Sequence, residues 1–322
     1  MARLLIAHAA DDFQFWHNLQ LIKAFRCTCA LVAVLFLTTG SVFAADSSII
    51  APGATLEKLG EGYAFTEGPA VDRDGNVFFS DIPNNRIVKW SAADGKFSDW
   101  LKPSGYANGT YFDRSGNLLA ASEQKGELWS IAPDKKVTVL ATNFGGKLFN
   151  GPNDLWIRPD GGVYFTDPLY FQPFRNYDSK KMMDGQHVYF LSPDRKTVTR
   201  VTTDLAQPNG IIGTPDGKVL YVGDLGGGVS WAYDIQPDGK LTNKRLFYIT
   251  GSDGITIDDE GNIYITGSGV AVFDKMGKQI EYIAVPREVT TNVTFGGKDR
   301  DLLFITAGGS AYGLKMRVKG AR

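Results

Sequence analysis

The chain alternates short apolar runs with turns in which Asp and Gly recur. Residues 153–167, NDLWIRPDGGVYFTD, are typical: an oxygen-bearing side chain opens the segment, an apolar run follows, a Pro-Asp-Gly turn reverses the chain, and a second apolar run ends at Asp167. Two strand-length runs joined by an Asp-Gly turn are typical of a β-hairpin. The segment from Asn150 to Tyr170 therefore predicts two antiparallel strands with polar side chains at one end.

The same hairpin recurs along the chain. The other copies are EGPAVDRDGNVFFSD (67–81), NGTYFDRSGNLLAAS (108–122), NGIIGTPDGKVLYVGD (209–224), DGITIDDEGNIYITG (253–267) and a degenerate sixth, NVTFGGKDRDLLFIT (292–306). Further strand-like runs follow the copies, and the turn glycines recur roughly every forty to sixty residues, a period typical of four-stranded propeller blades. We therefore predict an all-β fold, a six-bladed β-propeller.

Closure of this ring needs a strand from elsewhere. The sixth copy is followed only by the run 310–318, which leaves its blade one strand short. The segment Thr55–Leu59, ahead of the first copy, is predicted to supply that outer strand. A two-sheet sandwich is the competing all-β arrangement, but it does not predict so regular a period.

A carboxylate or carboxamide stands eight residues before each turn glycine, roughly one strand length away. These residues are Glu67, Asn108, Asn153, Asn209 and Asp253, with Asn292 at the matching place of the sixth copy. In a propeller this position opens the innermost strand, so all six should converge at one end of the central channel. Three interpretations compete: turn capping, a structural cation and a catalytic cation. An all-oxygen ligand set favours Ca²⁺, Mg²⁺ or Mn²⁺.

The connections after the second strands should lie at the same end. The one after Thr166 is long and carries Tyr170, Phe174 and Arg175, so we predict a lid or a substrate wall. His187, where this loop enters the next strand, is predicted to be structural. The acids that end second strands either orient ligands or cap turns. They are Asp81, Asp167 and Asp224.

Residues 1–44 are predicted to be an export signal, and residues 45–322 the propeller domain. Lys23 and Arg26 precede an apolar run, and small residues follow before Ala45. An uncleaved anchor is the alternative, but the apolar run is short for a membrane span. We expect a periplasmic or secreted protein with no membrane contact after removal of the signal.

Removal of the signal would also remove both cysteines, Cys27 and Cys29, which excludes a Cys nucleophile and an ordinary zinc site. The formal net charge of -1 argues against a nucleic-acid partner.

Several motifs together resemble the SMP-30/gluconolactonase/LRE family over roughly residues 55–318. They are Thr66–Pro69, Phe79–Ile82, Asn150–Asp154, Phe165–Pro168, Pro208–Gly210, Phe295–Gly297 and Phe304–Ala307. The resemblance implies a six-bladed propeller with metal-dependent lactonase activity. It places the metal ligands at Glu67, Asn153, Asn209 and Asp253, and an acid/base role on Asp253. Two departures, Gly151 where some members have Arg and Gln124 where some bacterial members have His, leave the sugar open.

On this basis we expect a hydrolase that opens a lactone, with an aldonic acid lactone as its small-molecule substrate. The expected cofactor is a divalent cation, Ca²⁺ ahead of Mg²⁺, Mn²⁺ or Zn²⁺. Asp253 would accept a proton from the attacking water, while Asn108, Asn153 and Tyr170 orient the substrate. Three alternatives remain: another metal-dependent ester or lactone hydrolase, a non-catalytic propeller that binds a sugar or protein partner around a structural cation, and a strictosidine-synthase-like condensing enzyme, whose glutamate has no counterpart here. The oligomeric state is left open.

Overall fold

The computed structural model describes residues 47–175, 182–287 and 289–321. The predicted export signal lies outside the described residues, as do residues 176–181 of the long connection after Thr166. All regular elements in the described part of the chain are β-strands. No helix among these residues is long and apolar enough to cross a membrane.

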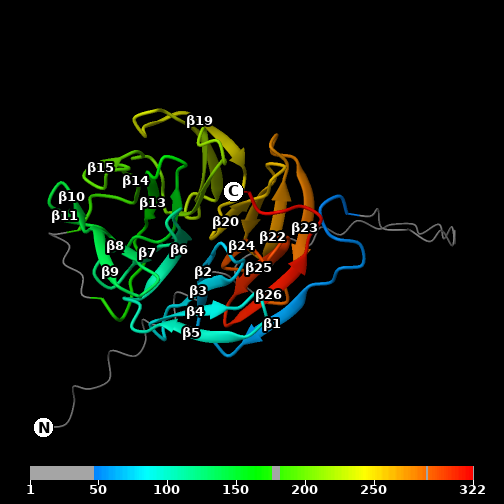
Figure 1. Cartoon of the computed structure of the whole chain (residues 1–322). Coiled ribbons are helices and arrows are strands. Elements are labelled where there is room, and N and C mark those ends of the chain that lie inside the picture. The colour runs from blue at the N-terminus through cyan, green and yellow to red at the C-terminus, as the bar shows by residue number, and fades with distance from the viewer. Residues whose placement is uncertain (1–46, 176–181, 288, 322) are drawn as a thin grey trace, which may run out of the picture. The chain divides into compact units, whose positions relative to one another are not determined.

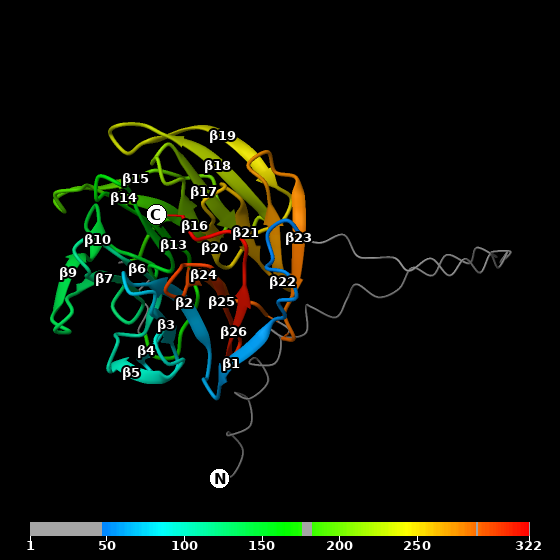
Figure 2. The same ribbon diagram turned by 45° about the vertical axis from the view of Figure 1, so that its right-hand side comes forward.

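The described strands form six four-stranded antiparallel sheets, which confirms the six-bladed propeller (Figure 1). Blade one contains β2 (Thr66–Val71), β3 (Val77–Asp81), β4 (Arg86–Trp90) and β5 (Phe97–Leu101), and blade two contains β6 (Ala107–Phe112), β7 (Leu118–Ser122), β8 (Glu127–Ile131) and β9 (Val137–Ala141). Blade three contains β12 (Leu155–Ile157), β13 (Val163–Asp167), β14 (His187–Leu191) and β15 (Val198–Arg200), and blade four contains β16 (Pro208–Gly213), β17 (Val219–Asp224), β18 (Val229–Ile235) and β19 (Leu241–Tyr248). Blade five contains β20 (Ile255–Ile257), β21 (Ile263–Thr266), β22 (Gly269–Phe273) and β23 (Gln279–Ala284), and blade six contains β24 (Asn292–Gly296), β25 (Leu302–Ala307), β26 (Ser310–Lys315) and β1 (Glu57–Glu61). Figure 2 shows the sheets around a common centre.

Strand β1 closes the ring, as the missing outer strand predicted. It pairs antiparallel with β26, and Glu61 lies opposite Ser310. In Figure 1 the blue β1 runs beside the red β26, so the two ends of the propeller domain share one sheet. This pairing completes blade six and joins the N-terminal strand of the domain to its last blade. The strand begins two residues after the predicted Thr55.

The Asp-Gly turns have a common hydrogen-bonding pattern. The Asp72 carboxylate accepts hydrogen bonds from the backbone N–H groups of Asp74 and Asn76, both at 2.9 Å, and Gly75 adopts a φ of 84°. Positive φ favours glycine. Asp113 and Asp258 organise the matching turns of blades two and five. The Asp-x-x-Gly-Asn sequence therefore fixes the register of the inner hairpins of blades one, two and five.

The apolar core lies between neighbouring blades. Trp156 and Tyr164 of blade three pack in one cluster with Ile211 and Val222 of blade four. Phe79 of blade one packs against Phe304 of blade six, with ring centroids 5.9 Å apart. Each sheet is thus covered on both faces, which explains why strands such as β3, β7 and β13 are buried along their full length.

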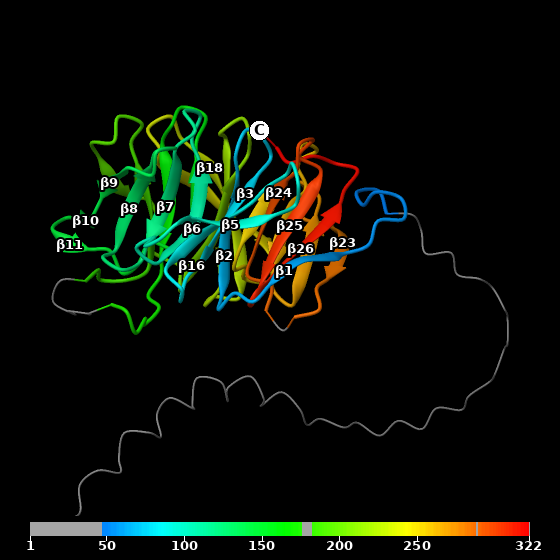
Figure 3. The same cartoon turned by 60° about the horizontal axis from the view of Figure 1, so that its bottom comes forward.

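One small element was not predicted. Strands β10 (Asn143–Phe144) and β11 (Lys147–Leu148) form a two-stranded hairpin between blades two and three. Runs of two residues are too short to produce a periodic apolar pattern. Leu148 also bridges to Met182 in the long connection after β13, so the hairpin and this connection lie at the same edge of the ring (Figure 3).

Candidate functional site at one mouth of the channel

The predicted oxygen-bearing residues all lie where the innermost strands begin. Glu67, Asn108 and Asn209 are the second residues of β2, β6 and β16, and Asn292 is the first residue of β24. The other two each lie two residues before an innermost strand. They are Asn153 before β12 and Asp253 before β20. All six positions are therefore at one end of the central channel, as the common register predicted.

Glycines bring these positions close together. Gly68, Gly109, Gly210 and Gly254 each follow one of the six residues and lie against the next blade. A Cβ on Gly210, for example, would fall inside contact distance of the Asp253 carbonyl oxygen. The backbone N–H of Gly109 donates a 2.6 Å hydrogen bond to the Asn153 carbonyl. Only a residue without a side chain permits so close an approach of neighbouring strands.

Hydroxyl groups join the same positions around the ring. Ser80 of blade one donates a 2.8 Å hydrogen bond to the Asn108 carbonyl of blade two. Thr166 of blade three makes the same 2.8 Å bond to the Asn209 carbonyl of blade four. Thr266 of blade five likewise reaches the Thr291 carbonyl of blade six. Second strands thus fix the inner strands of the following blades.

The acids that end second strands cap turns. Asp81 accepts hydrogen bonds from the backbone N–H groups of residues 64 and 65, Asp167 from those of residues 150 and 151, and Asp224 from those of residues 206 and 207. In each case the two donors lie three and two residues ahead of a predicted metal ligand, Glu67, Asn153 or Asn209. These carboxylates therefore hold the loops that deliver the ligands.

Glu67 and Asp253 form the acidic part of the site. Glu67 is buried and accepts hydrogen bonds from the Gly68 N–H at 3.0 Å and from the Asn292 side chain at 3.4 Å. Burial, followed by the charge of Asp253, raises the pKa of Glu67 well above its usual value. Burial and the charge of Asp154 raise the pKa of the partly exposed Asp253 to about 7, against a smaller opposing effect of a hydrogen bond from Asn209. Two acids this close favour an added positive charge.

The donor set fits a hard cation. Glu67 and Asp253 supply carboxylate oxygens, and the buried Asn153 and Asn209 supply amide oxygens. In the described part of the chain, no three His, Cys, Asp or Glu side chains form a metal-binding group by themselves. A cation at this mouth would therefore depend on the amides as well as on the two carboxylates.

Tyr170 joins this mouth from the long connection after β13. Its hydroxyl accepts a 3.0 Å hydrogen bond from the Asn209 side-chain nitrogen. Burial, and then the charge of Asp253, raise the pKa of the Tyr170 hydroxyl, so it remains protonated and can donate its own proton. The predicted substrate-orienting Tyr170 and two predicted metal ligands are thus neighbours.

Two acids at this mouth were missing from the sequence-based site. Asn108 donates a 2.6 Å hydrogen bond from its side chain to Glu123, whose pKa burial raises to about 7. Asp154 is buried beside the channel, and burial also raises its pKa to about 7. A signal for Asp154 existed, because four of the other copies have Gly at that position. Glu123 follows the second strand of its blade, and no comparable feature of the sequence distinguished it.

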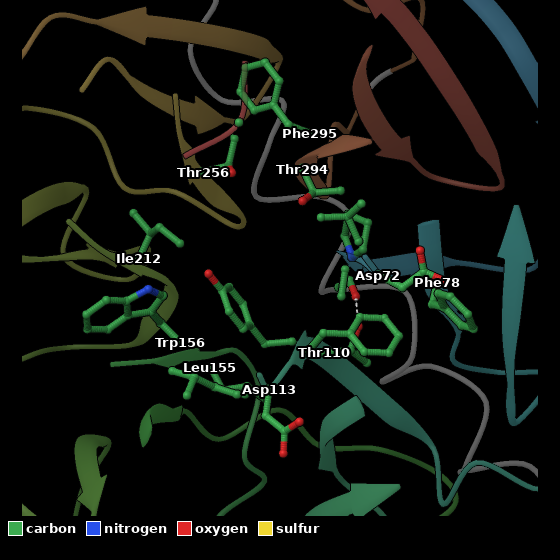
Figure 4. A pocket seen from close by; sticks show the side chains of 18 of the residues that line it. Asp72, Phe78, Thr110, Asp113, Leu155, Trp156, Ile212, Thr256, Thr294 and Phe295 are labelled. Carbon is green, nitrogen blue, oxygen red and sulfur yellow. Dashed lines mark hydrogen bonds between the residues drawn. The ribbon is translucent and has the colours of Figure 1, made fainter. Parts of the chain in front are cut away.

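The opposite end of the channel opens into a cavity of about 880 Å³. Its walls come from the far ends of the inner strands and their turns, including Asp72, Thr110, Trp156, Thr256 and Phe295 (Figure 4). Asp113 and Asp72 there are occupied in capping their own turns. None of the predicted metal ligands lines this cavity. Asp154 and Asn292 do line it, so the cavity begins directly beneath the candidate site and opens at the other end of the channel.

Comparison with known proteins agrees with this arrangement. A gluconolactonase from Zymomonas mobilis is 29% identical over 303 residues, which cover 85% of this chain and 84% of that protein. A lactonase drp35 from Staphylococcus aureus is 30% identical over 246 residues, covering 68% of this chain and 69% of the relative. The solved structure of a gluconolactonase from Xanthomonas campestris superposes with a TM-score of 0.76 at 29% identity, over 83% of this chain and 91% of the other. The SMP-30/Gluconolactonase/LRE-like region matches residues 65–309, and the chain belongs to this family.

Proposed function

We propose that the protein hydrolyses a small lactone, with glucono- and other aldonolactones as its substrate class. The observation that carries the proposal is the placement of two acids, Glu67 and Asp253, with the amides of Asn153 and Asn209 at the starts of the inner strands. The relatives named gluconolactonase and lactonase support the reaction class.

Glu67, Asn153, Asn209 and Asp253 would hold a divalent cation. Their all-oxygen donor set suits a hard cation, for which we propose Ca²⁺ ahead of Mg²⁺, Mn²⁺ or Zn²⁺. Such a cation, when bound, supplies the positive charge that polarises the lactone carbonyl and stabilises the oxyanion that develops there. Ca²⁺ also accepts an irregular and incomplete protein shell, which suits two amides and two carboxylates on four different blades.

The remaining chemistry belongs to side chains of this protein. The Asp253 carboxylate accepts a proton from the attacking water and returns it to the ring oxygen as the C–O bond of the lactone breaks. Asn108, Asn153 and Tyr170 orient the substrate. The bond from the Asn108 nitrogen to Glu123 fixes this amide, and its side-chain carbonyl oxygen would accept a hydrogen bond from a sugar hydroxyl.

A binding propeller with a purely structural cation is the second candidate. It is favoured by the hydrogen bond from the Asn292 side chain to Glu67, which joins blade six to blade one independently of any reaction. A structural cation at this place would tie the same blades together. Under either function we propose that the protein is exported to the periplasm or secreted, on the basis of the export signal predicted at residues 1–44.

An assay with a pH indicator separates these functions. Purified protein with Ca²⁺ is given glucono-δ-lactone, a second aldonolactone, an aryl ester and an acyl-homoserine lactone. We expect the aldonolactones to be opened with the highest kcat/KM. Preference for the ester or the acyl-homoserine lactone would instead favour a different hydrolase on the same scaffold. Hydrolysis of none of them, together with a lower Tm after EDTA treatment, would favour the binding propeller.

A further inference from the structure

The segment from Leu169 to Arg175 crosses the candidate mouth from blade four to blade two. At its start, the Gln207 side chain of blade four donates to the Leu169 carbonyl at 3.5 Å, and Tyr170 accepts from Asn209. At its end, the ring of Phe174 stacks on Tyr106 of blade two, with centroids 3.8 Å apart and planes 12° from parallel. Both ends of the segment are therefore fastened to blades other than its own.

Side chains of this segment alternate between the site and the solvent. Tyr170, Gln172 and Phe174 are partly buried, whereas Phe171 is 76% exposed and Pro173 is exposed. The inward side chains meet residues of the mouth in turn: Tyr170 meets Asn209, and Gln172 donates a hydrogen bond that lowers the pKa of Glu123. The inner face of the segment is thus polar at Tyr170 and Gln172 and closed by an aromatic stack at Phe174.

Arg175 anchors the C-terminal end of this segment. Its guanidinium donates to the backbone carbonyls of Phe149 and Asn150. Gly126 and Gly151 make room for it, because a Cβ on either residue would lie about 3 Å from a guanidinium nitrogen. Some family members have Arg at the position of Gly151. In this protein the guanidinium of Arg175 lies next to that position.

We propose that residues 169–175 form a specificity wall, and that Phe174 is a positioning residue that selects small polyhydroxylated lactones against lactones with a long acyl chain. The inference rests on the proposed lactone hydrolysis. Hydroxyl groups of a sugar lactone match the amides and carboxylates beneath the wall, namely Asn108, Glu123 and Gln172. The Phe174–Tyr106 stack joins the wall to blade two and would block a long acyl chain that extends in that direction.

The test compares kcat and KM for glucono-δ-lactone and for N-decanoyl-homoserine lactone in the wild type, Phe174→Ala and Tyr106→Ala. Phe171→Ala is the matched control, because it removes the same side chain from an exposed position of the same segment. Removal of either ring should raise the ratio of kcat/KM for the acyl lactone to kcat/KM for glucono-δ-lactone by about tenfold. The interaction energy of one aromatic pair is large enough to account for a change of that size. The change should lie mainly in KM, and both stack variants should show it.

Three results are decisive. An unchanged selectivity ratio in both stack variants, measured on protein with a normal thermal transition, would overturn the wall inference and leave lactone hydrolysis standing. The same change in Phe171→Ala would also overturn it, because the effect would not then depend on the stack. A wild type that opens neither lactone would overturn the proposed function and the wall inference together.

Discussion

The Asn108 side chain donates a 2.6 Å hydrogen bond to the Glu123 carboxylate, and both residues are buried at the mouth of the channel. The pair joins the opening of β6 to the residue that follows β7 in the same blade. This short hydrogen bond holds the Asn108 amide in one orientation. The free energy of unfolding should therefore depend on pH through the ionisation of Glu123.

Glu123→Gln should make the protein relatively more stable as the pH rises. Burial raises the pKa of Glu123 from 4.5 to about 7 in the folded protein. Because the folded pKa lies above the unfolded one, the protonated acid is favoured in the fold, and its stabilisation is lost as pH rises from 4.5 through 7. Gln keeps an oxygen that can accept from Asn108. The free energy of unfolding, measured with urea, should favour the variant by on the order of 3 kcal/mol more at pH 8 than at pH 4. The exposed Glu57→Gln is the control, and a pH-independent difference for Glu123→Gln would contradict the expectation.

Gly210→Ala should damage both the fold and the site. The new Cβ would push against the carbonyl of Asp253 on the neighbouring blade. Separation of these strands should lower the free energy of unfolding by about 1–3 kcal/mol and weaken cation binding, since Asn209 and Asp253 lie on either side of the contact. Gly267→Ala is the control, because nothing lies within 4 Å of its Cβ position. Equal effects of the two changes on Tm and on Ca²⁺ affinity would show that the close approach is unimportant.

Asp167→Ala should release the loop that carries Asn153. The carboxylate accepts hydrogen bonds from the N–H groups of Asn150 and Gly151, at 3.0 and 2.8 Å. Loss of both acceptors should cost about 1–3 kcal/mol of unfolding free energy and should also reduce Ca²⁺ affinity. Asp167→Asn retains one side-chain oxygen and should lose less. A titration that finds native Ca²⁺ affinity in the Ala variant would argue against a role for this carboxylate in placing Asn153.

Much of the fold follows from the sequence, because each blade repeats the same local pattern. The Asp-x-x-Gly-Asn turns fix the inner hairpins of blades one, two and five. The common spacing from turn to Glu67 or Asn209 brings distant residues to one mouth. The outer strand β1 followed from the missing strand of blade six. What local patterns could not supply is contact between paired strands and contact across blades. Glu123 reaches Asn108 only after β6 and β7 pair, and the stack of Phe174 on Tyr106 joins residues from different blades.

Asp253→Asn should abolish turnover without unfolding the protein. The variant keeps a side chain of the same shape but loses the proton acceptor, so kcat for glucono-δ-lactone should fall by about 10²- to 10⁴-fold. Circular dichroism and Tm should remain close to those of the wild type. Asp299→Asn, an exposed change in the turn before β25, serves as the control and should keep full activity.

The central claim is that the ring of Glu67, Asn153, Asn209 and Asp253 holds a cation on which lactone opening depends. The most direct measurement is the initial rate of glucono-δ-lactone hydrolysis by protein stripped with a chelator, before and after addition of Ca²⁺. We predict a fall of at least about a hundredfold on stripping and recovery of the rate with Ca²⁺. Near-native turnover by the stripped protein, above the spontaneous rate of ring opening, would contradict the account.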